Sequence, residues 1–469
     1  MTLNEAVQIA IRNNRQIQSA YMDRTLQKFS FKVITNKFSP VIRLQGNTGL
    51  QSDTLTPRDE RQKDQTSDNF QTDISANVSK MIPTGGTLSY QFARSESDSR
   101  TNDSRHINKD NSSRNSMSLG FRQPLLKGAG TAVTMAPIQA AKRNEIRNRL
   151  YLKSTLINTV TEVILAYRNL LQISKQVDIN KTSLNRAKEL LAVNELLIET
   201  GRMPSMEIVQ TESDIANREF SYQQTLNSYD NARLNLIKLL DVNKDSDIIA
   251  VDKIVIETIE PDLQKCLDMA YARRSDYISA KLSLEDAKSN LILAKNNMLW
   301  DLALDSQYRF MDAYDKLSWN PDQQSFQVGL ELTIPIYGDL SREESSLNAK
   351  IAFKKADLNL QELSNNVEIE VFDAIRNVKM RNIQVKLAEK ARELSEKKVT
   401  IEQLKLNLGR STNFQLVSFQ NDLVSAQNNE LEAQISYLNA LTGLDQLIGT
   451  TLDTWGIEFK DEHKLESEY

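Results

Sequence analysis

Residues 3–20 read LNEAVQIAIRNNRQIQSA, and they align without a gap with residues 263–280, which read LQKCLDMAYARRSDYISA. The alignment pairs leucine with leucine at the start of both stretches and Ser-Ala with Ser-Ala at the end of both. Self-similarity of this kind is the sequence sign of an internal repeat. We therefore read the chain as two copies of one unit before dividing it into domains.

The repeat continues at a second, shorter offset. Residues 166–169, AYRN, match residues 374–377, AIRN, and the match runs on without a gap to the end of each copy. The shorter offset means that the first copy carries extra residues, which lie between 41 and 124. The chain is thus predicted to be a tandem duplication of residues 2–249 and 262–450, followed by a polar C-terminal tail over 451–469.

Each copy is predicted to contain a helix, a set of strands, a long helix and a further helix. Only 14 of the 469 residues are Gly and 9 are Pro, under half the usual share of about 12%, which favours long helices. The first helix opens with the capping-box sequence TLNE at residues 2–5 and is predicted to run to Ser39. The long helices are predicted over 137–200 and 341–408, the second opening with a capping box at Ser341, and each would span about 95–100 Å.

The apolar residues of the long helices follow a heptad spacing, with steps that alternate between three and four residues. Small and polar residues also occupy this seam, among them Asn180 and Asn194 in the first copy and Arg381 in the second. Such a seam favours a wide tube of helices over a tight leucine-packed dimer. An ordinary coiled coil also tolerates polar seam positions and remains an alternative.

Between the first helix and the long helix of each copy, the apolar residues alternate with polar ones, as in β-strands. The pattern predicts about four strands within 41–124 and one hairpin within 301–336, with Pro83-Thr84-Gly85-Gly86 as a turn. One apolar and one polar face suit a membrane barrel strand, and they suit a half-buried strand of a soluble sheet as well. The very polar stretches 51–69 and 94–116 are predicted to be solvated connecting loops.

Composition excludes several functional classes. With 58 Lys and Arg against 62 Asp and Glu, the net charge of −4 argues against binding nucleic acid. One cysteine and two histidines leave no Cys/His zinc site, and no phosphate-binding loop or catalytic motif is present, so we expect no enzyme activity, no metal and no cofactor. No apolar stretch is long enough for a membrane-spanning helix. If the protein is exported, we expect the numbered chain to begin after a removed signal.

The duplication, the strand-to-helix junctions QPLLKGAG at 123–130 and IPIYG at 334–338, and the two Gly-Arg helix turns resemble the TolC family of outer-membrane efflux proteins. The resemblance covers residues 2–450. It implies a mainly α protein with a membrane β-barrel, in which three copies form a barrel in the outer membrane of a diderm bacterium, continued by a periplasmic tunnel of helices. The junction residues are Pro124, Gly128, Pro335 and Gly338.

In that family the helix turns form the periplasmic tip, where the channel closes and an adaptor protein docks. The resemblance therefore assigns adaptor contact to the two turns, namely Gly201, Arg202, Met203, Gly409, Arg410 and Ser411. Helix C-caps alone would also explain the two glycines. The gate would comprise Glu207, Leu406, Arg410, Gln415 and Ser418. Because Gln415 and Ser418 stand where the best-known member has an acidic ring, strong block by multivalent cations is in doubt, and a Glu207–Arg410 contact is our hypothesis for closure.

The first copy departs from the family by an extra hairpin. Four strands in the first copy and two in the second would give a trimer eighteen barrel strands, whereas the best-known member has twelve. We favour the wider barrel because residues 70–78 are as amphipathic as any strand of this chain. The alternatives are that residues 70–97 fold outside the barrel or that they lengthen it.

The resemblance implies a passive exit duct that works with a periplasmic adaptor, an inner-membrane pump and outer-membrane lipid. The competing interpretation is a soluble coiled-coil scaffold without channel activity, for which the duplicated amphipathic strands would have no purpose. Nothing in the sequence identifies the exported substrate.

Overall fold

The structure is a computed structural model that describes residues 1–56, 65–103, 106–201, 203–315, 322–337 and 339–459. The chain divides into two compact units. The helical unit comprises residues 1–26, 146–281 and 359–469, and the strand unit comprises residues 27–145 and 282–358.

The long helices α4 (Ala136–Glu199) and α8 (Leu340–Asn407) begin and end within one residue of their predicted bounds. Each is followed by a shorter partner, α5 (Glu207–Leu240) or α9 (Asn413–Ile448). The predicted capping box at Ser341 is wrong, because α8 already begins at Leu340 and the Ser341 hydroxyl donates backward to the carboxylate of Asp339 at 2.6 Å.

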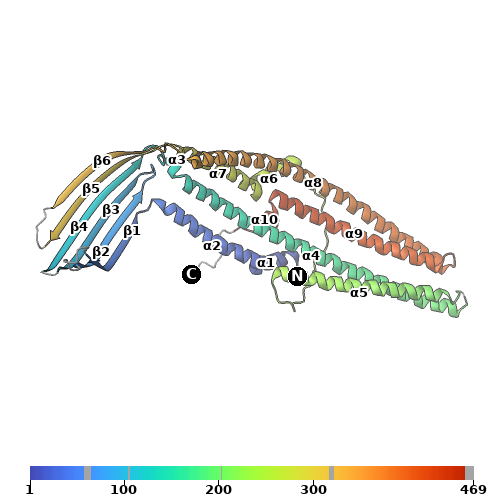
Figure 1. The fold of residues 1–469 in the computed structure, drawn as a ribbon. Coiled ribbons are helices and arrows are strands. Elements are labelled where there is room, and N and C mark those ends of the chain that lie inside the picture. The colour runs from blue at the N-terminus through green and yellow to red at the C-terminus, as the bar shows by residue number, and fades with distance from the viewer. Residues whose placement is uncertain (57–64, 104–105, 202, 316–321, 338, 460–469) are drawn as a thin grey trace. The chain divides into compact units, whose positions relative to one another are not determined.

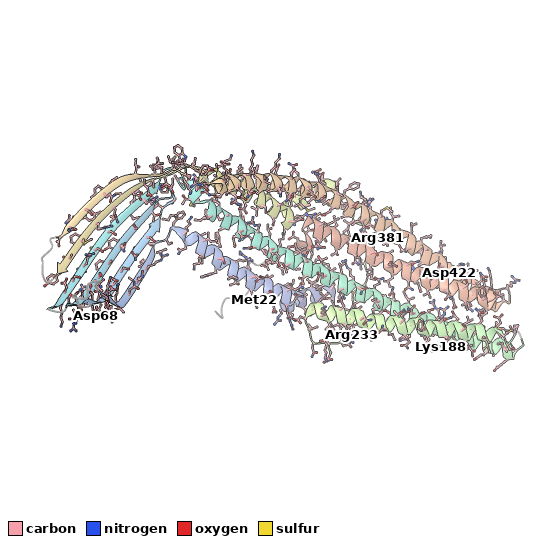
Figure 2. The ribbon with its side chains drawn as sticks, viewed as in Figure 1. Met22, Asp68, Lys188, Arg233, Arg381 and Asp422 are labelled. Atoms are coloured by element: carbon pink, nitrogen blue, oxygen red, sulfur yellow. The ribbon has the colours of Figure 1, made fainter. Side chains whose placement is uncertain are left out.

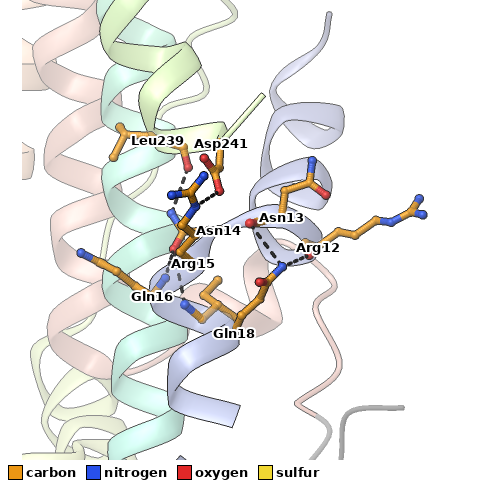
Figure 3. A network of polar contacts seen from close by, with 9 residues as sticks. Arg12, Asn13, Asn14, Arg15, Gln16, Gln18, Leu239 and Asp241 are labelled. Carbon is orange, nitrogen blue, oxygen red and sulfur yellow. Dashed lines mark hydrogen bonds and ion pairs between the residues drawn. The ribbon is translucent and has the colours of Figure 1, made fainter. Parts of the chain in front are cut away.

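The first helix of each repeat is broken, which the sequence analysis did not predict. The capping box at Thr2 and Glu5 is present, but α1 (Leu3–Asn13) ends at Asn14, and α2 (Arg15–Thr35) and the 3-10 turn η1 (Asn36–Phe38) follow. Figure 3 shows the reason: the Asn14 side-chain amide donates to the carbonyl of Leu239 at 2.9 Å, and its oxygen accepts from the Gln16 amide at 2.9 Å. The second repeat breaks at the equivalent position, Arg274, between α6 (Leu263–Arg273) and α7 (Ser275–Asn297).

Six antiparallel strands form one sheet in chain order, as Figure 1 shows. Four lie in the first repeat and two in the second, the numbers that the sequence predicts. The strands are β1 (Val41–Leu55), β2 (Gln65–Met81), β3 (Thr87–Asp103), β4 (His106–Pro124), β5 (Asp301–Asp315) and β6 (Gln323–Thr333).

Where the structure describes the polar stretches 51–69 and 94–116, they are strand except at residue 56, so the prediction of loops is wrong for these residues. Residues 57–64 and 104–105 lie outside the described part of the chain. Residues 94–103 and 106–116 pair along the whole β3–β4 hairpin, from Arg94 opposite Asn115 to Asp103 opposite His106. Strand pairing uses backbone amides and carbonyls, which any side chain supplies. Side chains such as Ser97 and Asn69 also bond across the strands, with 2.7 Å between hydroxyl and amide oxygen. The strands β2 and β3, which hold most of residues 70–97, each pair with a strand on both sides, so this segment belongs to the sheet.

Glycine and proline shape the junction after β4 as the sequence predicts. Pro124 ends β4, and Gly128 has a φ of +79°, a conformation that glycine adopts without strain. A Cβ on Gly85, in the β2–β3 turn, would lie 2.4 Å from the Gly128 carbonyl oxygen, so this close approach requires a glycine. After β6, Pro335 follows the strand, while Gly338 lies outside the described residues.

The beginning of the predicted polar tail packs against the helical unit. Residues 451–454 form α10 (Thr451–Thr454), and Leu452 is only 3% exposed. Leu452 belongs to a core cluster with Ile17 and Leu156. The polar character predicted for the tail therefore does not extend to these residues, and residues 460–469 lie outside the described part of the chain. Among the described helices, none has an apolar stretch long enough to span a bilayer.

Candidate functional site

One face of the sheet is apolar along matching rows of all six strands. The strand register places Ile42, Val78, Tyr90, Leu119, Tyr308 and Phe326 in one row across the sheet. Tyr90, Leu119 and Phe326 are 37%, 48% and 71% exposed, so this face lacks a cover. An apolar band of this kind across a whole sheet marks a surface that is buried in an apolar partner.

The opposite face is polar and carries a cluster of charges. Arg122 on β4 lies between Asp305 on β5 and Glu331 on β6, at 3.0 and 2.5 Å between guanidinium nitrogen and carboxylate oxygen. The three side chains line a shallow groove on this face together with Gln307 and Gln327. This face therefore suits contact with water.

The two outer strands of the sheet have a neighbour on one side only. In the described part of the chain, β1 pairs with β2 alone and β6 pairs with β5 alone. A long edge strand exposes unpaired backbone amides and carbonyls and tends to pair with another chain. The sheet is thus open at both ends for pairing with further copies.

Each long helix ends in a left-handed glycine at the turn that the sequence analysis assigned to the tip. Gly201 and Gly409 have φ values of +69° and +68°. The amide of Gly409 donates to the carbonyl of Leu406, and that of Arg410 donates to Lys405 at 2.8 Å, which closes the helix end. Met203 lies in the first turn and Ser411 in the second, while Arg202 lies outside the described residues.

The residues assigned to the gate occupy the same end of the helices but are not one cluster. Leu406 is 8% exposed and packs with Leu190, Leu416 and Val417, which joins α4, α8 and α9. Glu207 begins α5, and Gln415 lies in the first turn of α9, where its amide donates to the Thr412 hydroxyl at 3.2 Å. Ser418 is half-buried one turn later. Within the described chain, Glu207 and Arg410 form no ion pair.

Sequence reasoning missed a buried polar cluster that joins the two helix pairs at this end. The Thr211 hydroxyl on α5 accepts from the side-chain amides of Asn194 on α4 and Asn413 on α9, both at 2.9 Å. The exposed fractions of Asn194, Thr211 and Asn413 are 0%, 0% and 2%. The carbonyl oxygens of both asparagines have no hydrogen-bond partner among the described residues. We call Asn194, Thr211 and Asn413 the tip cluster.

A second contact between the same helices lies further along the bundle. The guanidinium of Arg218 on α5 donates to Asn421 on α9 at 2.9 Å and forms an ion pair with Asp214 at 2.5 Å. Arg218 is 8% exposed. The α5–α9 contact is therefore polar and specific over at least two turns.

The α8–α9 turn is held by a carboxylate. Glu402 accepts from the Ser411 hydroxyl at 2.5 Å and from the Lys405 ammonium at 3.2 Å. These hydrogen bonds hold the pKa of Glu402 below its usual range. The contribution of Glu402 to the turn is thus present at neutral pH and lost as the pH falls through that lowered pKa.

A basic groove of about 750 Å³ lies beside this turn, between α8 and α9. Its lining combines four positive side chains with one carboxylate, with polar residues that include Ser411 and with apolar residues; the charged residues are Lys397, Lys398, Lys405, Arg410 and Glu402. Lys398 crosses the groove to the carboxylate of Asp422, labelled in Figure 2, at 2.9 Å. Two of the predicted tip residues, Arg410 and Ser411, therefore line a concave and positively charged surface. In the described part of the chain, no group of His, Cys, Asp or Glu side chains is arranged to hold a metal ion.

Residues 266–450 match the family model described as outer membrane efflux protein. The match falls in the second repeat, where it agrees with the resemblance drawn from the sequence. The fold is similar to three solved structures: the Campylobacter jejuni CmeC outer membrane channel, the Vibrio cholerae outer membrane protein VceC and the open state of the Neisseria gonorrhoeae MtrE outer membrane channel.

The identities to CmeC, VceC and MtrE are 13%, 12% and 14%, with TM-scores of 0.67, 0.69 and 0.69. The alignments cover 96%, 95% and 96% of this chain, and 86%, 96% and 89% of the three channels. At such identities the likeness shows the fold. No curated protein matches the chain by sequence.

Proposed function

We propose that this chain, which carries an outer membrane efflux protein domain over residues 266–450 and the fold of outer-membrane channels, is the outer-membrane exit duct of an export system. The main support for this proposal is the row of apolar residues that crosses all six strands in register. A lipid bilayer covers such a face, and the polar face with Arg122 then lines a water-filled lumen. A soluble scaffold would leave the apolar face exposed to water.

Three copies complete the duct in this proposal. An outer-membrane sheet cannot leave its edges unpaired in lipid, so β1 of one copy pairs with β6 of the next until the barrel closes. Three six-stranded sheets give an eighteen-stranded wall. The helices of the three copies form the periplasmic tunnel.

The duct is passive, so export through it requires partner proteins. An inner-membrane pump supplies the energy, and a periplasmic adaptor binds the helix tips, where Arg410 and Ser411 line the basic groove. An adaptor segment with acidic side chains would complement this groove. The proposal includes no catalysis and no nucleic-acid partner.

Cell fractionation and negative-stain imaging test this function. We expect the protein to sediment with outer membranes, to need detergent for extraction and to give threefold particles. A detergent-independent rod or a compact monomer would contradict the duct and favour the scaffold.

The tip cluster is our candidate for the contact that keeps the tip closed. It joins α5 of the first helix pair to α9 of the second, and it leaves two buried carbonyl oxygens unsatisfied. A buried oxygen without a hydrogen bond destabilises its state by about 1–3 kcal/mol. The cluster thus holds the helices together while making their separation less costly, which suits a gate that opens when an adaptor docks.

We expect Thr211→Val to loosen the tip, because valine keeps the shape of threonine and removes the oxygen that both asparagines bind. Single-channel conductance in planar bilayers should rise in this variant. The matched control is Thr211→Ser, which keeps the hydroxyl and should behave as the wild type. Equal conductance in all three proteins would show that the cluster does not govern closure.

The Glu207–Arg410 contact stays a proposal for the assembled trimer. If it holds the tip, Arg410→Glu alone should raise conductance, because two negative charges would then face each other. Adding Glu207→Arg should restore the wild-type value. A double variant that conducts as much as Arg410→Glu alone would exclude this pairing.

A further inference from the structure

The two repeats build equivalent cores from equivalent positions. In α4, the buried residues Val163, Tyr167 and Leu170 stand at the positions of the buried Val371, Ile375 and Val378 in α8. In the shorter partners, Leu236 and Leu240 of α5 correspond to Leu444 and Ile448 of α9. A contact seen in one repeat can therefore be transferred to the other, residue by residue.

Within the chain, the repeats meet where α4 of the first contacts α9 of the second. Arg168 on α4 donates to the carbonyl of Leu438 at 2.7 Å, the Asn439 amide oxygen at 3.3 Å and the Thr442 hydroxyl at 2.8 Å. Its exposed fraction is 9%, and burial lowers its pKa to about 10. One turn away on α9, Gln446 donates to Asn158 of α4 at 3.0 Å.

The duplication repeats three polar residues of this contact on α8 and α5, where they are exposed. Arg168 and Asn158 of α4 correspond to Arg376 and Asn366 of α8, with the residue type kept in both cases. On the other side, Asn439 of α9 corresponds to Asn231 of α5, again with the type kept. The equivalents of Leu438, Thr442 and Gln446 are Asp230, Leu234 and Lys238, and all of these side chains on α8 and α5 are exposed.

The apolar residues beside Arg376 show the same difference between the repeats. Ile369 and Phe372 of α8 are 62% and 57% exposed, whereas their equivalents in α4, Thr161 and Ile164, are 4% and 0% exposed. On α5, Leu234 is 49% exposed, whereas its equivalent Thr442 is 4% exposed. The face of α8 that presents Arg376 is thus more exposed than the equivalent face of α4, on which α9 binds Arg168.

We propose that α8 of one copy packs against α5 of a second copy through this transferred contact, with Arg376 bound to the side chains of Asn231 and Asp230. Among the described residues, the only ion pair of Arg376 is with Asp373 on its own helix, at 2.9 Å. Asp230 adds a carboxylate where the internal contact has Leu438, so the contact between copies gains an ion pair. The contact joins two different surfaces, α8 of one copy and α5 of the next, and such a contact builds a ring when the rotation between copies closes. The inference rests on the proposed multichain duct and names the helices that join its chains.

Cysteine cross-linking tests the contact in the full-length protein extracted from membranes. The only natural cysteine, Cys266, is buried and would be changed to alanine, the residue at its first-repeat equivalent, Ala6. In that background, Arg376→Cys with Asn231→Cys should react with a short bis-maleimide. Most of the monomer band should then shift to a ladder that ends at three chains on a denaturing gel.

In the matched control, the cysteine is placed at the neighbouring position Asn377 instead of at Arg376. Asn377 and its first-repeat equivalent, Asn169, are both exposed, so Asn377→Cys with Asn231→Cys should give no ladder. Each variant is first sized in detergent without cross-linker. Trimers that cross-link through Asn377 and not through Arg376 would overturn this interface and leave the duct intact, whereas monomers in every variant and in the wild type would overturn the duct itself.

Discussion

Excision of the β2–β3 hairpin is expected to leave a trimeric duct with a twelve-stranded barrel about two thirds as wide, since barrel diameter grows roughly linearly with strand number. The sheet register makes this experiment possible. Val41 pairs with Ser79, Ser79 with Ser89 and Ser89 with Gly120, so removal of both strands sets β1 directly against β4 with their apolar faces on the same side.

The new hairpin can be closed by a tight turn. In the same register, Leu55 at the end of β1 comes opposite His106 at the start of β4. Replacing residues 56–105 by Asn-Gly supplies the two-residue turn that suits an antiparallel hairpin. The change also removes Thr84, whose carbonyl accepts from the Gly130 amide at 3.0 Å, so we expect lower thermal stability and would first measure the amount of trimer.

The width of the barrel can be measured with neutral polymers of graded size, which are added on the barrel side of a planar bilayer. The largest polymer that enters the pore and lowers conductance should shrink from the wild type to the excised variant. This measurement reports the width of the barrel mouth and not the state of the helix turns. An unchanged polymer limit, or twelve strands in a density map of the wild type, would place β2 and β3 outside the wall.

The sequence predicts the elements that depend on local pattern. The bounds of α4 and α8 follow from their uninterrupted heptads, and the six strands follow from alternation. The break at Asn14 has no such signal, because its side chain is held by Leu239, a residue 225 positions away. The strands within 94–116 were not predicted, because nearly all of their side chains are polar. Such strands show no alternation of apolar and polar residues.

The residues of the candidate site likewise divide into those that the sequence predicts and those that it does not. The turns at Gly201 and Gly409 could be predicted, because a helix end that needs a positive φ selects glycine. A partial signal for the tip cluster was present, since Asn194 occupies a seam position that would ordinarily be apolar. Its partner Thr211 and the more distant Asn413 could not be identified, because their contact depends on the packing of helices that lie 202 positions apart in the chain.

Tyr90→Arg is expected to abolish assembly in the outer membrane. Tyr90 lies in the apolar row between Val78 on β2 and Leu119 on β4. An arginine on the lipid face of a barrel costs up to about 2–4 kcal/mol, the larger values applying toward the bilayer midplane, and a trimer would carry this cost in every copy. The total is comparable with the whole stability of an ordinary domain, which is about 5–15 kcal/mol. The amount of trimer in outer-membrane fractions, measured on gels without heating, checks this prediction.

The next residue on the same strand is the control, because successive side chains of a strand point to opposite faces. Gln91 lies on the polar face between Asn77 and Ser118, and neither neighbour carries a charge. Gln91→Arg should therefore assemble normally and alter only the ion preference of the pore. If Gln91→Arg fails to assemble while Tyr90→Arg assembles normally, the assignment of the two faces is reversed. If both variants reach normal amounts, the apolar face does not meet lipid, since an arginine on the lipid face of every copy would cause a measurable loss.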